Sequence, residues 1–320
     1  PEATPWEQGE IVGACTPPLF QCLEKLAAQG EVIFQEDRPG RVLALIEEKQ
    51  RAAARARAQG NAKTTERTGR PTTALIVQVG ARRSCLSYTG RRQAGENLEQ
   101  LLGQREPGRA KPLVMSDALS SNTADEAGLI RCHCLAHGRR QFSERDEVFP
   151  AESAVVVTAL KFGYDHDNEA RAQQLTAQER VVYHQTHSEP ILTPLKTWWE
   201  AQTVQRLVEP NSSLGKAIAY MVSPWDSLTR LLHEPGAPLD NNTAERALKL
   251  AIRQRKNSLC YASEHSASLA SVLTRGIATC VQAGVKALEY LVAVQEHRQE
   301  VFANPSAWLP WNYEAALVPW

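Results

Sequence analysis

The sequence lacks any long apolar run and any excess of charge of one sign. No stretch approaches the roughly 20 consecutive apolar residues that cross a bilayer, and no charged-then-apolar signal segment opens the chain. We therefore expect no membrane partner. Lysine plus arginine equal aspartate plus glutamate, 36 against 36, so any charge that binds nucleic acid must be local.

The cysteine positions also show no pattern typical of a disulfide framework. The seven cysteines are scattered and odd in number, and a chain of this length can bury a substantial core without covalent cross-links. Hydrophobic residues make up 42% and charged residues 22%, as in ordinary globular proteins of one large domain or two. These features predict a reducing, cytoplasmic location. Because the chain begins at Pro1, we also expect an N-terminal part to be missing.

What is present begins with an alternation of strands and helices. Apolar runs predict strands over 32–34, 74–79, 85–88, 113–115 and 129–132, and a further short run spans 41–46. Helical spacing is found over 19–29, 94–102 and 123–127 and from Gly138 onward. The first 150 residues therefore predict an α/β layer structure.

A basic segment interrupts this part between residues 49 and 70. It combines seven basic residues with one acid, Glu66; the basic residues are Lys49, Arg51, Arg55, Arg57, Lys63, Arg67 and Arg70. We interpret it as a helical arm that frays into a solvated linker. A surface loop and an arm that contacts DNA remain equal alternatives.

Strand signals vanish from residue 151 to about 232. Helical periodicity covers 154–164, 176–186, 191–200 and 214–232, and several tryptophans supply bulky packing groups. Further helices are expected over 266–283 and 285–301. The predicted organisation is an N-terminal helical segment (1–30), a first core part (31–150), an all-α insertion (151–237) and a last helical part (238–320).

Glu245 is the most informative single residue of that last part. Asp240 or Asn241 is suited to cap a helix that starts there. Helical spacing places Asn241, Glu245, Leu248 and Ile252 on one face. A carboxylate on a largely apolar face is costly unless a cation or a hydrogen-bond donor meets it.

A basic stripe runs beside Glu245 on the same predicted helix. It consists of Arg246, Lys249 and Arg253, continued by Arg255 and Lys256. One carboxylate next to such a stripe suits a phosphodiester lying across the helix. Ordinary cap chemistry with a first-turn acid explains this segment equally well when it is taken alone.

Two more carboxylates follow predicted strands. Asp117 comes after the strand over 113–115, and Asp37 after the strand over 32–34. Acids just beyond buried strands can meet at one edge of a sheet, where a rigid scaffold holds the several oxygen ligands that hard divalent ions take. Glu36 competes with Asp37, because neighbouring strand residues point to opposite faces. For each acid alone, a turn or cap is the alternative.

A series of short motifs then suggests a relationship. Residues 134–142 resemble a Cys-x-Ala-His-x-Arg-Arg-x-Phe signature, and residues 309–312 a Leu-Pro-Trp-Asn motif. Between them, in the expected order, lie the segments 175–180, 188–192, 213–220, 240–246 and 255–257. Together these motifs cover roughly residues 110–313 and resemble the transposases of the insertion-sequence-66 family.

This resemblance implies an RNase H-like mixed sheet flanked by helices, with an Asp-Asp-Glu site. Asp117 matches the second Asp of the family and Glu245 its Glu, while Asp37 stands for the first Asp. The three acids would hold two Mg²⁺ (or Mn²⁺) ions. The chain departs from the family at two points: it has Arg38-Pro39 where Glu-Thr is usual and Ala118-Leu119-Ser120 where a Gly-Tyr type is usual.

Other residues are assigned supporting roles. His137 would support the metal site or contact DNA, with a merely packed histidine as an equal alternative, and Asn241 and Asn242 would order the helix start. Phosphate contacts are expected from Arg139, Arg140, Arg246, Lys249, Arg255 and Lys256; for Arg139 and Arg140, ordinary helix-surface charge is an equal alternative. Cys132, His133, Cys134 and His137 crowd too closely for a tetrahedral zinc site. Members of the family normally carry an N-terminal zinc-binding and DNA-binding region, which we expect to precede this chain.

The activity implied is that of a DNA transposase, which cleaves transposon ends and transfers the strand to target DNA. Its partners would be double-stranded DNA, further copies of the chain assembled on that DNA, and accessory proteins of the element, at the nucleoid of a prokaryote. Two alternatives stay open. One is an inactive, transposase-derived protein that binds DNA or assembles with partners, and the other is an RNase H-like nuclease without strand transfer.

Overall fold

The computed structural model describes residues 4–59, 71–117, 128–258 and 260–318. It divides into two compact units. Unit 1 comprises Pro1–Pro112, Ser121–Gly128 and Asn242–Trp320, and unit 2 comprises Leu113–Ser120 and Leu129–Asn241. Unit 1 is thus built from segments that precede and follow most of unit 2 in the sequence.

Three antiparallel strands form the centre of unit 1. They are β1 (Val32–Pro39), β2 (Pro71–Val79) and β3 (Arg82–Thr89), and β2 pairs with both of the others. Gly80 has a φ of 57° in the two-residue turn between β2 and β3, where hairpin geometry demands positive φ. The apolar runs predicted at 32–34, 74–79 and 85–88 lie within these strands.

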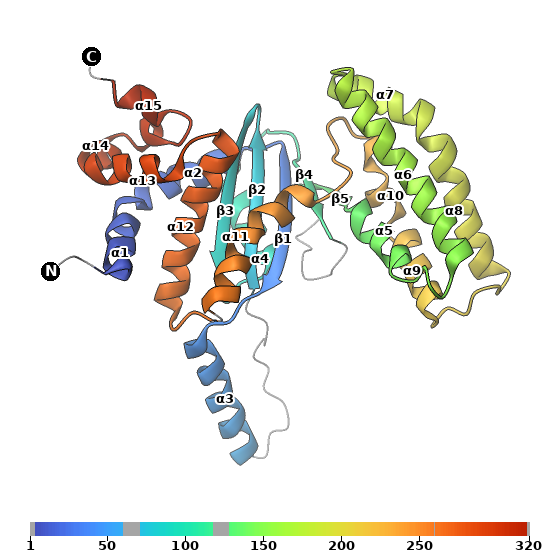
Figure 1. The fold of residues 1–320 in the computed structure, drawn as a ribbon, viewed down its shortest axis with the longest axis horizontal. Coiled ribbons are helices and arrows are strands. Elements are labelled where there is room, and N and C mark those ends of the chain that lie inside the picture. The colour runs from blue at the N-terminus through green and yellow to red at the C-terminus, as the bar shows by residue number, and fades with distance from the viewer. Residues whose placement is uncertain (1–3, 60–70, 118–127, 259, 319–320) are drawn as a thin grey trace. The chain divides into compact units, whose positions relative to one another are not determined.

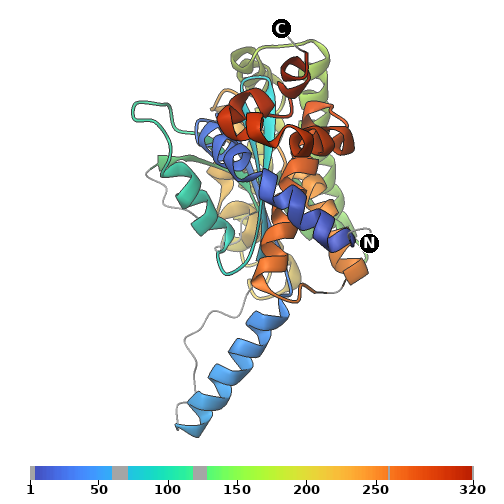
Figure 2. The same ribbon diagram turned by 90° about the vertical axis from the view of Figure 1, so that its left-hand side faces the viewer.

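Helices cover both faces of these strands. Helices α11 (Asn242–Ser258) and α4 (Ala94–Leu102) each pack against β1 and β2, and α12 (Glu264–Ala283) packs against β3. The edge-on view shows α4 on one side of the strands and α11 with α12 on the other (Figure 2). The face on which a strand residue lies therefore determines which helix it meets.

The two ends of the chain pack together in unit 1. Helices α1 (Pro5–Cys15) and α2 (Pro17–Ala27) meet α13 (Ala287–Glu296), α14 (Arg298–Ala303) and η4 (Pro305–Trp308), and α15 (Tyr313–Ala316) packs on η4. The prediction of a single helix over 285–301 is wrong, because the helix is interrupted at His297. The ring of His297 stacks on Trp308 at 4.9 Å, an arrangement that accompanies the break.

In the sequence, a long helix, α3 (Leu43–Ala58), lies between β1 and β2. The apolar run over 41–46 is therefore mostly helical. Val42 makes only a single bridge to Tyr261, and the helix starts at the next residue. The helical part of the predicted arm is confirmed through Ala58, and its continuation over 60–70 lies outside the described residues.

Unit 2 combines a parallel strand pair with helices. Strand β4 (Leu113–Ser116) pairs with β5 (Ile130–His133), and α5 (Leu135–Ser143) follows. The remaining helices are α6 (Pro150–Ala172), α7 (Ala177–His187), α8 (Glu189–Val204), α9 (Ser213–Val222), α10 (Trp225–Leu228) and η3 (Arg230–Leu232). They share one core that includes Phe142, Trp199 and Trp225. The helical character predicted for residues 151–232 is confirmed, but the single helix expected over 214–232 is divided into α9, α10 and η3.

The described residues thus form a mixed α/β protein (Figure 1), as the sequence predicts. The finer expectation of an RNase H-like arrangement and the four predicted domain boundaries stay predictions. The short helix predicted over 123–127 lies outside the described residues. None of the described helices combines the length and apolarity needed to cross a membrane.

Candidate metal and nucleic-acid site

Asp37 lies towards the end of β1 and is bound to neighbouring elements of unit 1. The hydroxyl of Thr73 donates to its Oδ1 at 2.5 Å, and the backbone N–H of Ala94 donates to Oδ2 at 2.9 Å. Ala94 is the first residue of α4, where a carboxylate also interacts favourably with the helix dipole. Asn97 donates to the same Thr73 hydroxyl. These bonds give Asp37 a structural role in joining β1, β2 and α4.

Glu36 lies on the opposite face of β1. Neighbouring strand residues alternate between faces, so Glu36 points to the side covered by α11, whereas Asp37 points to α4. Its side chain is only 1% exposed, and the guanidinium of Arg38 lies 3.1 Å from its Oε1. A buried carboxylate of this kind needs positive charge or donors nearby.

Glu245 lies in the first turn of α11 and is half-buried. Its neighbours Ala244 and Leu248 are buried, as the predicted apolar face requires. Because α11 packs across β1 and β2, the helix that carries Glu245 covers the strand face that carries Glu36. Unit 1 therefore contributes two carboxylates to the same layer of its structure.

The predicted basic stripe of α11 faces outward where its side chains are described. Arg246, Lys249 and Arg253 are exposed, and Asn242 is half-buried at the first position of the helix. The backbone of Arg255 and Lys256 is helical, but their side chains lie outside the described part. The stripe thus offers at least three cations to solvent beside the turn that carries Glu245.

Asp117 and His137 come together within unit 2. Asp117 directly follows β4 and is 8% exposed, and His137 lies on the first turn of α5 and is half-buried. A carboxylate oxygen of Asp117 and a ring nitrogen of His137 lie within 4.8 Å of each other. One hydrogen bond fixes this placement, because the backbone N–H of Cys134 donates to the carbonyl of Ser116 at 3.0 Å.

Asn241 belongs to the same part of unit 2. It is fully buried, and its backbone N–H donates to the Sγ of Cys134 at 3.2 Å. The N–H of Leu135 donates to the carbonyl of Leu239 at 3.0 Å. These bonds gather the end of β4, the start of α5 and residues 239–241 around Cys134. Asn241 directly precedes α11, and the helix cap expected there stays a prediction.

The cysteines and histidine around this point are neutral at pH 7. Burial raises the pKa of Cys132 to about 12 and that of Cys134 to about 11. Burial, assisted by the charge of Arg131, lowers the pKa of His133 to about 4. Neither thiol is a ready thiolate ligand for a soft metal, so carboxylate oxygens and the imidazole of His137 are the ligand types on offer.

Tyr164 of α6 is a further residue of unit 2 with a buried polar group. Burial, followed by the charge of Asp240, raises the pKa of its phenol, which places the ring near Asp240 and Cys134. The hydroxyl is buried and has no hydrogen-bond partner among the described residues. It remains protonated and can donate to a bound oxygen anion. No sequence signal marks it, because it is one residue of a long helix.

Arg139 and Arg140 are exposed on α5. Their neighbour Gly138 is buried, and a side chain added there would meet Met221 at 2.2 Å, so α5 packs closely on α9 along that edge. The two arginines therefore face away from this contact and remain accessible for phosphate.

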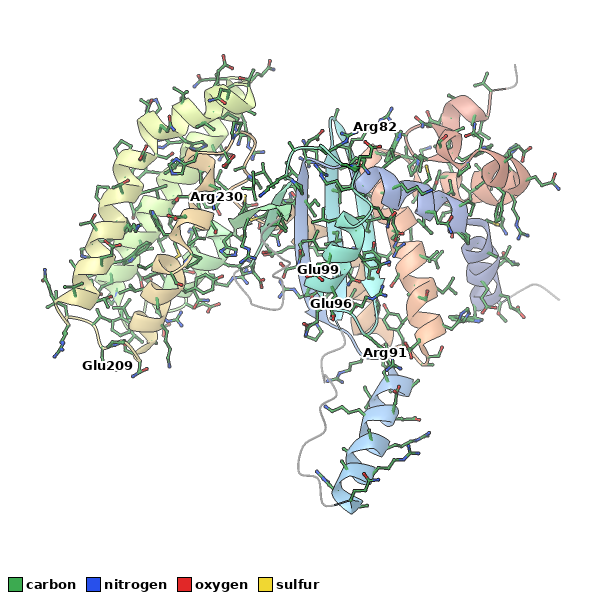
Figure 3. The ribbon with its side chains drawn as sticks, turned by 180° about the vertical axis from the view of Figure 1, so that it is seen from behind. Arg82, Arg91, Glu96, Glu99, Glu209 and Arg230 are labelled. Atoms are coloured by element: carbon green, nitrogen blue, oxygen red, sulfur yellow. The ribbon has the colours of Figure 1, made fainter. Side chains whose placement is uncertain are left out.

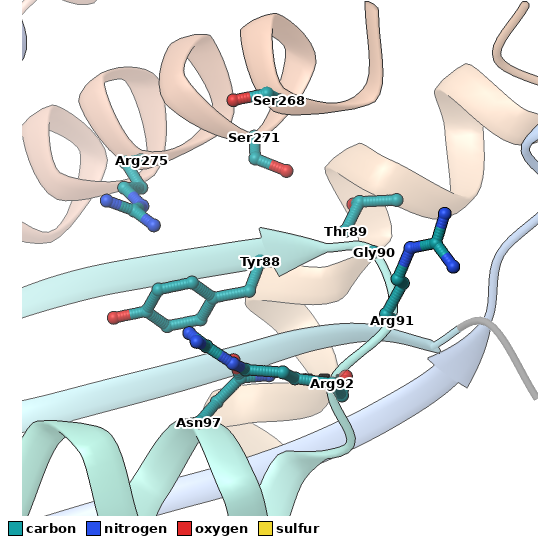
Figure 4. Close-up of a pocket in the computed structure, with 9 residues that line it drawn as sticks. All are labelled: Tyr88, Thr89, Gly90, Arg91, Arg92, Asn97, Ser268, Ser271 and Arg275. Atoms are coloured by element: carbon teal, nitrogen blue, oxygen red, sulfur yellow. Dashed lines mark hydrogen bonds between the residues drawn. The ribbon is translucent and has the colours of Figure 1, made fainter. Parts of the chain in front are cut away.

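A polar cavity of about 270 Å³ lies in unit 1 between β3, α4 and α12 (Figure 4). Its cations are largely engaged by protein groups. Arg275 lies over the ring of Tyr88 at 4.4 Å and is 2.9 Å from a carboxylate oxygen of Glu24. Arg91 is bound to Glu48 and Glu264. These contacts fix helices onto the strands rather than leave cations free for a ligand.

Comparisons with known proteins give the class. Residues 12–269 match the family model described as "Transposase IS66 family". Since the match covers most of the chain, the protein belongs to this family of transposases. The resemblance inferred from the motifs is thereby confirmed.

Individual relatives are similar over part of their length. The chain is 28% identical over 189 residues to the uncharacterized protein y4jD of Sinorhizobium fredii, covering 58% of this chain and 36% of that protein. It is 29% identical over 159 residues to y4hP of the same organism, covering 46% and 28%. The chain thus spans about a third of the length of these curated relatives. No solved structure matches it.

Proposed function

We propose that this chain is the catalytic part of a transposase that cleaves DNA at transposon ends and transfers the strand to target DNA. The observation that carries the proposal is the family match over residues 12–269, which includes every candidate acid. Those acids lie on three separate elements: Glu36 on β1, Asp117 after β4 and Glu245 on α11.

The donor set fits a hard divalent ion. We propose that Glu36 and Glu245 of unit 1, together with Asp117 and His137 of unit 2, supply the ligand atoms. Oxygen ligands with one imidazole suit Mg²⁺ or Mn²⁺ rather than a thiolate-seeking metal. When bound, two such ions would supply positive charge to activate an attacking oxygen and to stabilise a leaving one. Burial of Glu36 and Asp117 is consistent with this, because buried carboxylates require compensating charge.

We assign the first acid to Glu36 in place of Asp37. The carboxylate of Asp37 accepts bonds from Thr73 and from the first turn of α4, and it lies on the face away from α11. Glu36 lies on the face that α11 covers. We infer that the first acid of the family motif corresponds to Glu36 rather than to Asp37; a shift of one residue reverses the side-chain direction in a strand.

The remaining residues bind and orient the DNA. Exposed Arg246 and Lys249 on α11, with Arg139 and Arg140 on α5, would bind backbone phosphates, which set the position of a duplex without reading its sequence. Tyr164, whose phenol lies near Asp240, and Asn242, in the first turn of α11, can donate hydrogen bonds to DNA. The carboxylates act as ligands, so no covalent bond between protein and DNA is required.

The test replaces one acid at a time. Glu245→Gln keeps the size and removes the charge; we expect metal-dependent nicking of a transposon-end duplex to fall on the order of a thousandfold or more, since a metal ligand is lost. Duplex binding without metal should be unchanged. Glu99→Gln is the matched control, because Glu99 is an exposed acid on α4 (Figure 3).

Full nicking by Glu245→Gln would disprove the role of this residue. Assays of the unsubstituted chain distinguish a transposase from the two alternative functions. Nicking without joining of a pre-cleaved end to target DNA would identify a nuclease that lacks strand transfer. Duplex binding with neither reaction would identify a DNA-binding remnant.

A further inference from the structure

Helix α3 carries a basic half that the proposed active centre does not use. Between Lys49 and Gln59 there is no acid, and the cations there are Lys49, Arg51, Arg55 and Arg57. The three arginines are exposed. Within unit 1 the helix projects away from the strands and from the other helices (Figures 1 and 2).

The root of this helix is firmly attached to unit 1. Val42 forms a β-bridge with Tyr261, and the N–H of Leu43 donates to the carbonyl of Tyr261 at 2.8 Å. Val42 and Leu45 are fully buried in a small apolar cluster with Ala267 of α12. Residues 42–45 are therefore anchored to the segment that joins α11 to α12.

Arg91, at the end of β3, adds a second attachment. Its guanidinium lies 2.7 Å from a carboxylate oxygen of Glu48 on α3 and 2.8 Å from one of Glu264 on α12. Figure 4 shows Arg91 beside the cavity that α12 borders. The other acid of α3, Glu47, pairs with Arg51. The acids of α3 thus lie near its root, where Glu47 pairs with Arg51, and Arg55 and Arg57 lie farther along the exposed part of the helix.

One exposed face of α3 carries small side chains, which allow another molecule to approach the helix closely. At 100° per residue, Gln50, Ala54 and Ala58 follow one another along one face. Arg51 and Arg55 flank this face on one side and Arg57 flanks it on the other. Ala54 and Ala58 are exposed, so small side chains lie between Arg51 and Arg55 on one side and Arg57 on the other. A major groove about 12 Å wide admits a helix, and phosphates line both of its edges.

We propose that α3 is a DNA-binding arm that enters a groove of duplex DNA, with Arg51, Arg55, Arg57 and Lys49 bound to phosphates on both strands. The choice of DNA as partner rests on the proposed function. The surface itself is separate from the acids. Because its root joins the segment that follows α11, the arm fixes a bound duplex relative to the helix that carries Glu245.

The experiment removes two charges from the arm. Arg55→Gln with Arg57→Gln keeps helix-forming side chains, and Lys25→Gln with Lys111→Gln removes two exposed charges elsewhere in unit 1. Duplex affinity is measured by fluorescence anisotropy against salt concentration, with a chelator present. Because each phosphate contact contributes about 0.9 to the salt slope, the arm variant should lower the slope by about 1.8. It should bind on the order of tenfold more weakly at 0.1 M salt.

A second measurement locates the DNA directly. A photo-crosslinking amino acid at Ala54 should join to the duplex, whereas the same group at exposed Ala303 of α14 should not. If the arm variant has the same salt slope as the control variant, and Ala54 gives no crosslink, the proposed DNA-binding arm is wrong. If the arm variant instead loses self-association in sedimentation while its DNA binding is unchanged, α3 contacts a second copy of the chain. Because neither readout requires cleavage, failure of the arm is distinguishable from failure of the proposed enzyme.

Discussion

At the scale of single residues, Glu36 and Asp37 show how strand alternation gives adjacent carboxylates different surroundings. Asp37 is bonded to Thr73 and to the start of α4. Glu36 is 1% exposed on the other face, beside Arg38. The first is surrounded by hydrogen-bond donors of the fold, and the second lies on the face covered by the helix of Glu245.

This contrast predicts opposite effects of two substitutions. Asp37→Asn should lower the free energy of unfolding by about 1–3 kcal/mol, because charge-assisted bonds are lost, and should retain nicking. Glu36→Gln should abolish nicking with a smaller effect on stability. Urea unfolding and the nicking assay measure the two quantities. Nicking lost in Asp37→Asn but kept in Glu36→Gln would restore Asp37 as the ligand.

His133 predicts a dependence of stability on pH. Its pKa in the folded chain is about 4, below the value of about 6.5 in an unfolded chain, so between these values the unfolded state binds more protons. The free energy of unfolding should therefore fall as the pH drops from about 6.5 to about 4, by on the order of 3 kcal/mol from this residue. His133→Gln should remove that part of the loss, measured by urea unfolding at several pH values.

The exposed His233 supplies the control. His233→Gln removes an imidazole without touching the buried one. A profile for His133→Gln that coincides with the parent profile would contradict the assignment.

At the scale of elements, periodicity and caps located several helices well. Helix α4 spans the predicted range Ala94–Leu102, and a capping box between Gln93 and Glu96 starts it. Both signals are local, so the sequence contains them in full. The run over 41–46 and the helix over 285–301 were less successful, because Val42 pairs with Tyr261 and His297 stacks on Trp308. Those partners lie far along the chain or on another element.

The packing of α9 predicts a sharp difference between two glycines of unit 2. A Cβ on Gly215 would lie 2.3 Å from the carbonyl oxygen of Glu209, whereas a Cβ on Gly163 of α6 meets nothing within 4 Å. Gly215→Ala should therefore destabilise by roughly 2–4 kcal/mol, since backbone must move. Gly163→Ala should stabilise by about 0.5–1 kcal/mol through helix propensity. Equal unfolding midpoints for the two variants would refute this description of the packing.

At the scale of the whole molecule, unit 1 is held together by contacts between segments that unit 2 separates in the sequence. The N–H of Cys85 donates to the hydroxyl of Thr279 at 3.1 Å, and the guanidinium of Arg275 donates to the carbonyl of Ser87 at 2.9 Å. Strand β3 is thus bound to α12 across nearly two hundred residues of chain. Long-range pairing of this kind leaves no local pattern.

A metal ion that binds only the folded chain should stabilise it. At a free Mn²⁺ or Mg²⁺ concentration 100 times the dissociation constant, one site adds about 2.7 kcal/mol to the free energy of unfolding. The gain, measured as a rise in melting temperature, should disappear in Glu36→Gln and Glu245→Gln and persist in Glu99→Gln. An equal rise in all four proteins would indicate unspecific binding and remove the support for a metal site at these acids.

The family, the α/β class and most of the helices and strands could be predicted from the amino-acid sequence. Motif order and apolar spacing are properties of neighbouring residues, so no tertiary information is needed for them. That Glu36 faces α11 while Asp37 binds α4, and that α3 is anchored to the segment after α11, became visible only in the folded chain. Side-chain direction and anchoring depend on which distant segments pack together, and that packing is a property of the folded chain.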